Sequence, residues 1–180
     1  MRMFKRKMQS SITGQGLSPI LLPTIWRMQA TDLSWYTGYG NRLVEMCTFA
    51  IYSSSDCTGT DLALGKQATA SGVYSVTYPS KPTYTYYAHN VTDGVDTWEG
   101  DTAIWVSPGD TNLSWIQVNI ANPTPVHSIK IIWLSQRLGC MPKSFDIQYS
   151  VDGVTFTTVA SGTTPSSSMT EMYYTSLLTF

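Results

Sequence analysis

Apolar and polar residues alternate with a period of two along much of the chain, which is the pattern of half-buried β-strands. The clearest run is 114–120, with the sequence SWIQVNI. Polar turns separate such runs, and no segment has a clear helical period. We expect strands at 25–30, 43–52, 114–120, 126–133, 144–149, 154–159 and 172–180. The sequence therefore predicts an all-β sandwich of about eight strands.

Two of these expected strands carry more specific predictions. In 43–52, alternation places Glu45 on one face with Leu43, Cys47 and Phe49, so a buried Glu45 carboxylate would need a partner. The Asp152-Gly153 pair predicts a hairpin turn into the strand expected at 154–159.

Residues 1–23 show neither the period of two of a strand nor the period of a helix, and they contain scattered glycine and proline residues. We expect an N-terminal arm over 1–23, either disordered or docked on a partner, and one sandwich domain over 24–180. No apolar run is long enough to predict a membrane span or a signal peptide.

The net charge of −1 is unevenly distributed, because four of the eleven basic residues are Arg2, Lys5, Arg6 and Lys7. The rest of the chain has seven basic and twelve acidic residues, a balance of −5. This mildly acidic body argues against nucleic acid as the main ligand. The basic segment either contacts nucleic acid or lipid, or is a solvated tail.

Three cysteines, an odd number with no CxxC spacing, argue against a zinc site. They are either reduced buried thiols or include a bridge between Cys47 and Cys57.

Two neighbouring segments carry candidate binding chemistry. An acidic turn, built on Gly94 and Gly100, is either a site for a hard cation or sugar hydroxyls, or a solvated turn. Its carboxylates are Asp93, Asp96, Glu99 and Asp101. Segment 73–90 carries five tyrosines, which either bind a ligand or cover one end of the fold.

Four segments resemble, in order, the discoidin or coagulation-factor C-type domain, whose carbohydrate-binding members are the family 32 modules. They are DLALGKQATASG (61–72), AHNVTDGVDTWEGDTAIWVS (88–107), SWIQVNI (114–120) and FDIQYSVDGVTFTTV (145–159). The resemblance covers residues 61 to about 160. It implies a galactose-binding-like jelly roll of eight strands, with the ligand loops gathered at one end.

The family's usual closing strand pair does not follow Val159 in this sequence. Segments 24–31 (TIWRMQAT) and 43–49 (LVEMCTF) look like that pair placed before the first signature. The order thus resembles a circular permutation, similar to modules of bacteriophage tail and fibre proteins. It implies that Glu45 folds back onto the turn at Asp93.

The resemblance implies a structural calcium ion beside the acidic turn. Asp93 and Glu45 fall on the family's carboxylate positions, and carbonyl oxygens near Asp96 and Thr102 would complete the coordination. The alternative is a hydrogen bond or salt bridge between Glu45 and the loop.

The resemblance also implies a shallow sugar site in which an aromatic ring stacks on a pyranose while polar groups bind its hydroxyls. The candidates are His89, Arg137, Asn112 and Trp98, with Tyr84, Tyr86 and Glu99 behind them. We expect Trp105 and Trp115 to belong to the core.

The function expected from these features is a non-enzymatic adhesion module of a phage or phage-like virion, as a tail, fibre or decoration protein. It would recognise cell-surface glycans in a multimeric assembly, with the arm docked on a scaffold protein. The alternative is a structural virion protein that uses the same loops for protein contacts. No catalytic motif is present, although a carboxylate pair such as Asp93 and Glu99 is the kind used in glycoside hydrolysis. The expected location is the virion or an extracellular surface.

Overall fold

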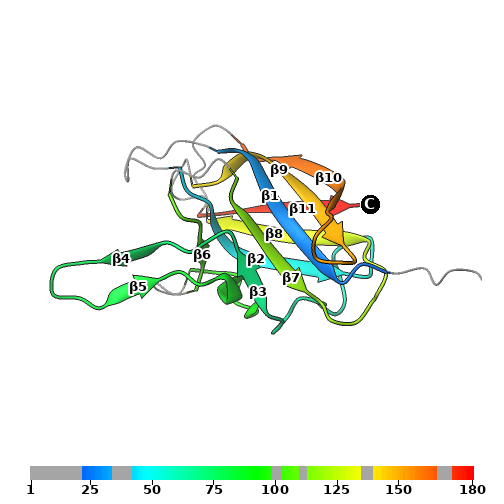
Figure 1. Ribbon diagram of the computed structural model, residues 1–180, viewed down its shortest axis with the longest axis horizontal. Coiled ribbons are helices and arrows are strands. Elements are labelled where there is room, and N and C mark those ends of the chain that lie inside the picture. Colours follow the sequence, from blue (N-terminus) through cyan, green and yellow to red (C-terminus); the bar gives the residue numbers. More distant parts are fainter. Residues whose placement is uncertain (1–21, 34–41, 99–102, 110–112, 135–139, 166–171) are drawn as a thin grey trace, which may run out of the picture.

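The structure is a computed structural model in which two antiparallel sheets pack face to face (Figure 1). It describes residues 22–33, 42–98, 103–109, 113–134, 140–165 and 172–180. The larger sheet has the order β10 (Thr157–Thr163), β9 (Pro142–Ser150), β1 (Ile25–Leu33), β7 (Trp115–Asn119) and β3 (Ala68–Ala70). The smaller sheet has the order β11 (Tyr173–Thr179), β8 (Ser128–Leu134), β2 (Glu45–Tyr52) and β6 (Trp105–Val106). The predicted all-β sandwich is confirmed.

Two small elements join these sheets at one end of the sandwich. Strands β4 (Ser75–Thr77) and β5 (Thr83–Thr85) form a separate hairpin that projects away from the sheets (Figure 1). A single 3-10 turn, η1 (Ala88–Thr92), follows the hairpin. Strands β3 to β6 have only two or three residues each, too short for the alternation to identify them from sequence.

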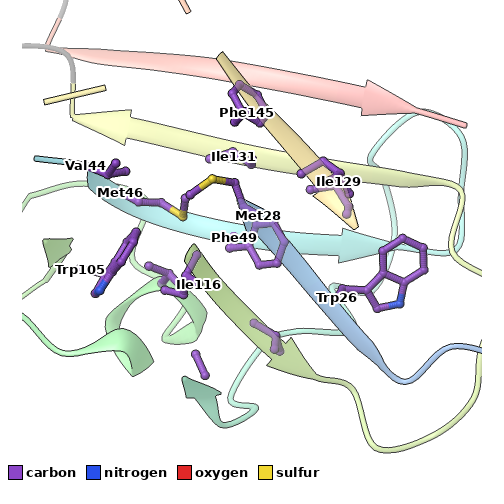
Figure 2. Packing of buried hydrophobic residues seen from close by; sticks show 14 of the residues in the cluster. Trp26, Met28, Val44, Met46, Phe49, Trp105, Ile116, Ile129, Ile131 and Phe145 are labelled. Carbon is purple, nitrogen blue, oxygen red and sulfur yellow. The ribbon is translucent and has the colours of Figure 1, made fainter. Parts of the chain in front are cut away.

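The main core lies between the two sheets and is filled by the inward residues of both (Figure 2). Its largest fully buried side chains include Met28, Phe49, Trp105, Trp133 and Phe145. Trp133 and Phe145 pack with ring centroids 5.2 Å apart. The prediction that Trp105 is a core residue is confirmed, and its indole Nε1 donates to the carbonyl of Gly72 at 3.0 Å.

A second apolar cluster covers the outer face of the smaller sheet. Its buried members are Leu43, Cys47, Tyr86, Ile104, Val106, Ile132, Leu134 and Cys140. The β2–β8 register shifts between Met46 and Thr48, and this irregularity changes which residues share a face. Phe49 therefore belongs to the main core and Cys47 to the second cluster, so the prediction that both share one face was wrong.

Two other details differ from expectation. Strand β10 begins at Thr157, not at Val154, because the Asp152 carboxylate accepts hydrogen bonds from the backbone nitrogens of Val154 and Thr155. Trp115 is only half-buried, because the alternation of β7 turns Ile116 inward and Trp115 toward the outer face of the larger sheet. The prediction of Trp115 as a core residue was wrong.

The start of β1 and the described C-terminus lie at the same end of the sandwich. The Trp26 and Phe180 rings stack there with centroids 5.5 Å apart, and Thr24 accepts a backbone hydrogen bond from Ile120. The β4–β5 hairpin projects from the other end (Figure 1). The proposed arm, residues 1–23, lies almost entirely outside the described residues.

Gly162 provides a direct test of the packing between β9 and β10. A Cβ atom at this position would lie 2.8 Å from Cε1 and 2.9 Å from Cε2 of the buried Phe145 ring. We expect Gly162→Ala to lower the free energy of unfolding by about 1–3 kcal/mol, because a filled core has no room for the methyl group. Thr163→Ala, at the next and exposed position, should change it by less than about 0.5 kcal/mol. Equal midpoints of urea unfolding for both variants would contradict this packing.

Candidate ligand-binding site at the hairpin end

The β4–β5 hairpin has one hydroxyl face and one aromatic face. The strands pair Ser75 with Thr85 and Thr77 with Thr83, and the side-chain oxygens of these pairs lie 3.0 and 2.7 Å apart. Between the hydroxyl pairs, Val76 lies opposite Tyr84. This alternation directs hydroxyl groups to one side and apolar groups to the other.

The aromatic face continues beyond both strands. Tyr74 and Tyr86 stack with centroids 6.3 Å apart, and Tyr78 meets Tyr84 edge to face at 6.1 Å. Tyr74, Tyr84 and Val76 pack against the second apolar cluster, which anchors the hairpin to the smaller sheet. Tyr86 is itself buried, with 8% of its surface exposed, so its ring supports the hairpin and is not open to a ligand.

An exposed aromatic pair stands where the hairpin meets η1. Tyr87, 51% exposed, stacks on His89 with centroids 5.4 Å apart and ring planes 18° apart. The turn that carries His89 is fixed by buried Asn90, whose amide donates to the Ile104 carbonyl at 2.8 Å. The sequence analysis included Tyr87 in the tyrosine-rich segment 73–90 but not among the named sugar-site residues, although it lies two residues before His89.

The remaining sugar candidates differ in exposure, and three of them lie outside the described residues. Trp98 is half-buried, packs against the second apolar cluster, and donates its backbone N–H to the Tyr173 hydroxyl at 2.7 Å. Its role is therefore at least partly structural. Tyr84 is half-buried on the hairpin and His89 is exposed. Glu99, Asn112 and Arg137 lie outside the described residues.

The acidic turn is attached to the smaller sheet by its second aspartate. Thr48 of β2 donates to Oδ1 of Asp96 at 2.7 Å, and Lys130 of β8 pairs with Oδ2 at 3.1 Å. Burial lowers the pKa of Lys130, but the hydrogen bond and charge of Asp96 outweigh it and raise that pKa above its usual value. Asp93 instead closes its own turn by accepting the backbone N–H of Val95 at 2.8 Å.

Glu45 and Cys47 lie where β2 passes this turn. Glu45 is 1% exposed, and its backbone N–H donates to the Cys140 carbonyl at 2.7 Å. Burial raises the pKa of the Cys47 thiol to about 12, with additional contributions from the carboxylates of Glu45, Asp96 and Asp93. The hydrogen bond from Thr48 to Asp96 places β2 against the acidic turn, whereas the approach of Glu45 itself to Asp93 stays a prediction.

These contacts bear on the expected calcium ion. The side-chain oxygens of Asp96 contact Thr48 and Lys130, so near Asp96 the expected calcium ion would depend on backbone carbonyl oxygens. Within the described part of the chain, no three His, Cys, Asp or Glu side chains form a metal-binding group. Thr102 lies outside that part. Glu45 and Asp93 would therefore need several backbone carbonyls or waters to reach the six to eight oxygens that calcium prefers.

The hollow under the hairpin is small, about 10 Å³, and is lined by Glu45, Tyr86 and neighbouring apolar residues. A cavity of about 340 Å³ lies away from the hairpin, lined by Thr60, Asp61, Leu62, Leu64, Lys66, Ile120, Asn122 and Thr124. The hairpin end therefore offers an exposed ring surface for stacking and not an enclosed pocket.

The described residues thus form an antiparallel sandwich with exposed aromatic rings at one end. A family model described as the F5/8 type C domain matches residues 67–177, more than half of the chain. The chain therefore belongs to this family, also called the discoidin family, whose domains bind carbohydrates or proteins and are generally non-catalytic. No curated protein and no solved structure matches the chain.

The matched region differs in its limits from the resemblance seen in the sequence. It continues past residue 160 and includes most of β11, but it leaves out β1 and β2. Both omitted strands nevertheless lie inside the sheets, β1 between β9 and β7, and β2 between β8 and β6. The circular permutation stays a prediction. No helix in the described segments has the length and apolar character needed to cross a membrane.

The cysteines provide a test of the burial around β2. None of the three forms a disulfide, and Cys47 and Cys140 are buried while Cys57 is half-buried. With a pKa of about 12, Cys47 should be thiolate in only about 1 in 10,000 molecules near pH 8. We expect an aromatic disulfide reagent to modify one thiol, Cys57, in the folded protein and all three in urea. Rapid modification of Cys47 in a folded Cys57→Ser variant would contradict the burial.

Calcium binding by Glu45 and Asp93 can be tested by thermal unfolding. Calcium that binds only the folded chain, at about 100 times its dissociation constant, raises the free energy of unfolding by about 2.7 kcal/mol. This corresponds to a rise of roughly 5–10 °C in the midpoint of thermal unfolding. We expect this rise to disappear in Asp93→Asn and to persist in Asp96→Asn, because Asp96 is bound to Thr48 and Lys130. A midpoint unchanged by calcium in the wild type would rule out the site.

Proposed function

We propose that this chain is a non-enzymatic glycan-binding module of a phage or phage-like virion, which recognises cell-surface glycans through its hairpin end. The observation that carries the proposal is the exposed Tyr87–His89 stack, held on a turn whose buried Asn90 fixes its position. Because the Tyr87 ring is already stacked on His89, it loses little conformational freedom when a sugar binds to it.

The proposed chemistry is stacking combined with hydrogen bonding. The exposed ring of Tyr87 packs against the apolar face of a pyranose, while its hydroxyl and the imidazole of His89 exchange hydrogen bonds with sugar hydroxyls. Such a shallow contact is weak, on the order of −4 kcal/mol for millimolar dissociation. Many copies in a virion would convert weak contacts into firm adhesion.

The virion assignment is supported by the position of β1 and β2. Both precede the region that matches the family model, yet each lies between two strands of that region. This placement agrees with the permuted order that resembles phage tail and fibre modules. In this proposal the arm, residues 1–23, docks on a scaffold protein and the hairpin end faces outward.

A glycan array probed with a multivalent form of the full chain tests the binding site. We expect Tyr87→Ala to lower binding about tenfold, because it removes the stacking ring. Tyr87→Phe should retain most of the binding, because the ring remains. Leu177→Ala, which removes a 62% exposed side chain from β11, is the matched control and should bind as the wild type does.

Two results would contradict glycan recognition at this end. One is the absence of binding to every arrayed glycan by the multivalent wild type, which would favour the alternative of protein contacts in a virion. The other is a Tyr87→Ala variant that binds glycans as strongly as the wild type.

A further inference from the structure

The outer face of the larger sheet carries a continuous row of polar side chains. Strand registers align one outward residue from each of the five strands, in the order Thr158, Gln148, Arg27, Gln117 and Thr69. No described strand or helix packs over this face. The inward neighbours in the same strands form the main core, so the row is built on a rigid support.

Two aromatic rings are held in this face by Arg27. Its guanidinium carbon lies 3.4 Å from the centroid of the Phe156 ring and 4.6 Å from that of Trp115. Its Nε and Nη2 atoms both donate to Oε1 of Gln117, at 3.0 and 2.6 Å. A guanidinium fixed by stacking and by hydrogen bonds orients both rings, and both remain half-buried.

A shallow hollow lies on each side of this stack along the face. One, about 240 Å³, is lined by Thr31, Ser144, Phe145, Asp146, Ser161, Gly162 and Thr163. The other, about 220 Å³, is lined by Ile25, Gln67, Thr69, Gln117 and Asn119. Strand β1 connects the two hollows, because Thr31 lines the first and Ile25 lines the second. The distance along the strand between these residues is about 20 Å. The face therefore suits an extended ligand and not a single small one.

The charge of the face determines the class of ligand. The row, the two rings and the two hollows contain only one cation, Arg27, and one anion, Asp146. Arg27 is bound to Gln117, and Asp146 accepts a hydrogen bond from Ser161 at 2.6 Å. The other polar groups are amides and hydroxyls, which both donate and accept hydrogen bonds as sugar hydroxyls do. A neutral, hydroxyl-rich ligand is complementary to this surface, whereas nucleic acids and sulfated chains are not.

We propose that the outer face of the larger sheet binds an extended neutral polysaccharide, which lies along β1 from one hollow to the other across the Trp115–Arg27–Phe156 stack. The rings contact the apolar faces of its sugars, while the amides and hydroxyls bind their edges. This surface is separate from the Tyr87–His89 pair and does not depend on the function proposed for that pair.

Affinity electrophoresis of the full chain in gels containing xylan, mixed-linkage β-glucan, galactomannan or soluble starch tests the proposal. We expect at least one of these neutral polysaccharides to retard the wild type. Trp115→Ala should weaken that binding about tenfold, through loss of one stacking ring. Calorimetry with oligosaccharides of the bound polymer should show affinity that rises with chain length, because one sugar fills only one hollow.

Control variants separate this face from the hairpin end and from loss of folding. The double variant Thr69→Glu/Thr158→Glu changes only exposed side chains at the two ends of the row, and we expect it to keep the wild-type unfolding midpoint but lose polysaccharide binding. Thr175→Glu, on an exposed position of β11, is its matched control. Tyr87→Ala should be retarded as strongly as the wild type.

Three results would overturn the proposal. The first is a wild type that none of the neutral polysaccharides retards, or that only acidic ones retard. The second is full binding by the double glutamate variant. The third is polysaccharide binding that is lost in Tyr87→Ala and kept in Trp115→Ala, which would assign all glycan binding to the hairpin end. Measuring Tyr87→Ala and Trp115→Ala in both assays separates the two surfaces, because each variant should lose only the ligand of its own surface, and either proposal can therefore fail alone.

Discussion

Burial of β2 along both of its faces is the constraint on which the rest of the structure depends. All eight residues of this strand are buried, including Glu45 and Thr48. One face contributes Phe49 and Ile51 to the main core, and the other contributes Cys47 to the second apolar cluster. A strand buried on both faces needs a packed layer over each face. The larger sheet covers the inner face of β2, and the hairpin and the acidic turn cover its outer face.

The attachment of that second layer explains how a projecting hairpin can hold a defined surface. An isolated two-stranded hairpin is marginally stable in water, but this one is anchored through Tyr74 and Tyr84 to the second cluster. The 3-10 turn η1 is held by the hydrogen bond from Asn90 to the Ile104 carbonyl, and the acidic turn is attached to the smaller sheet by the contacts of Asp96 with Thr48 and Lys130. Asp96, one of the acidic residues that suggested a metal site, thus helps to position the acidic turn through its ion pair with Lys130.

The sequence predicted most of the fold because alternation directly reports burial on one side of a strand. It failed where a local feature overrode the alternation. A register irregularity at Cys47 reversed the face of Phe49, and turn capping by Asp152 delayed the start of β10. Trp115 was misplaced for a different reason, because the alternation in 114–120 already puts it on the face opposite Ile116, where Arg27 contacts its ring. The Tyr87–His89 stack was missed although the two residues are close in sequence, because the sequence does not show that their rings face each other.

The two aromatic surfaces differ in how their rings are held, and this difference has consequences for binding. At the hairpin end, Tyr87 stacks on one neighbouring ring and is half exposed, so the proposed glycan contact there is open to solvent. On the larger sheet, Trp115 and Phe156 are fixed by a cation and flanked by strands on a flat support, which suits a chain lying along the sheet. If both proposals hold, the module has two separate glycan contacts. Simultaneous contact at two weak sites raises the overall affinity without a deep pocket at either.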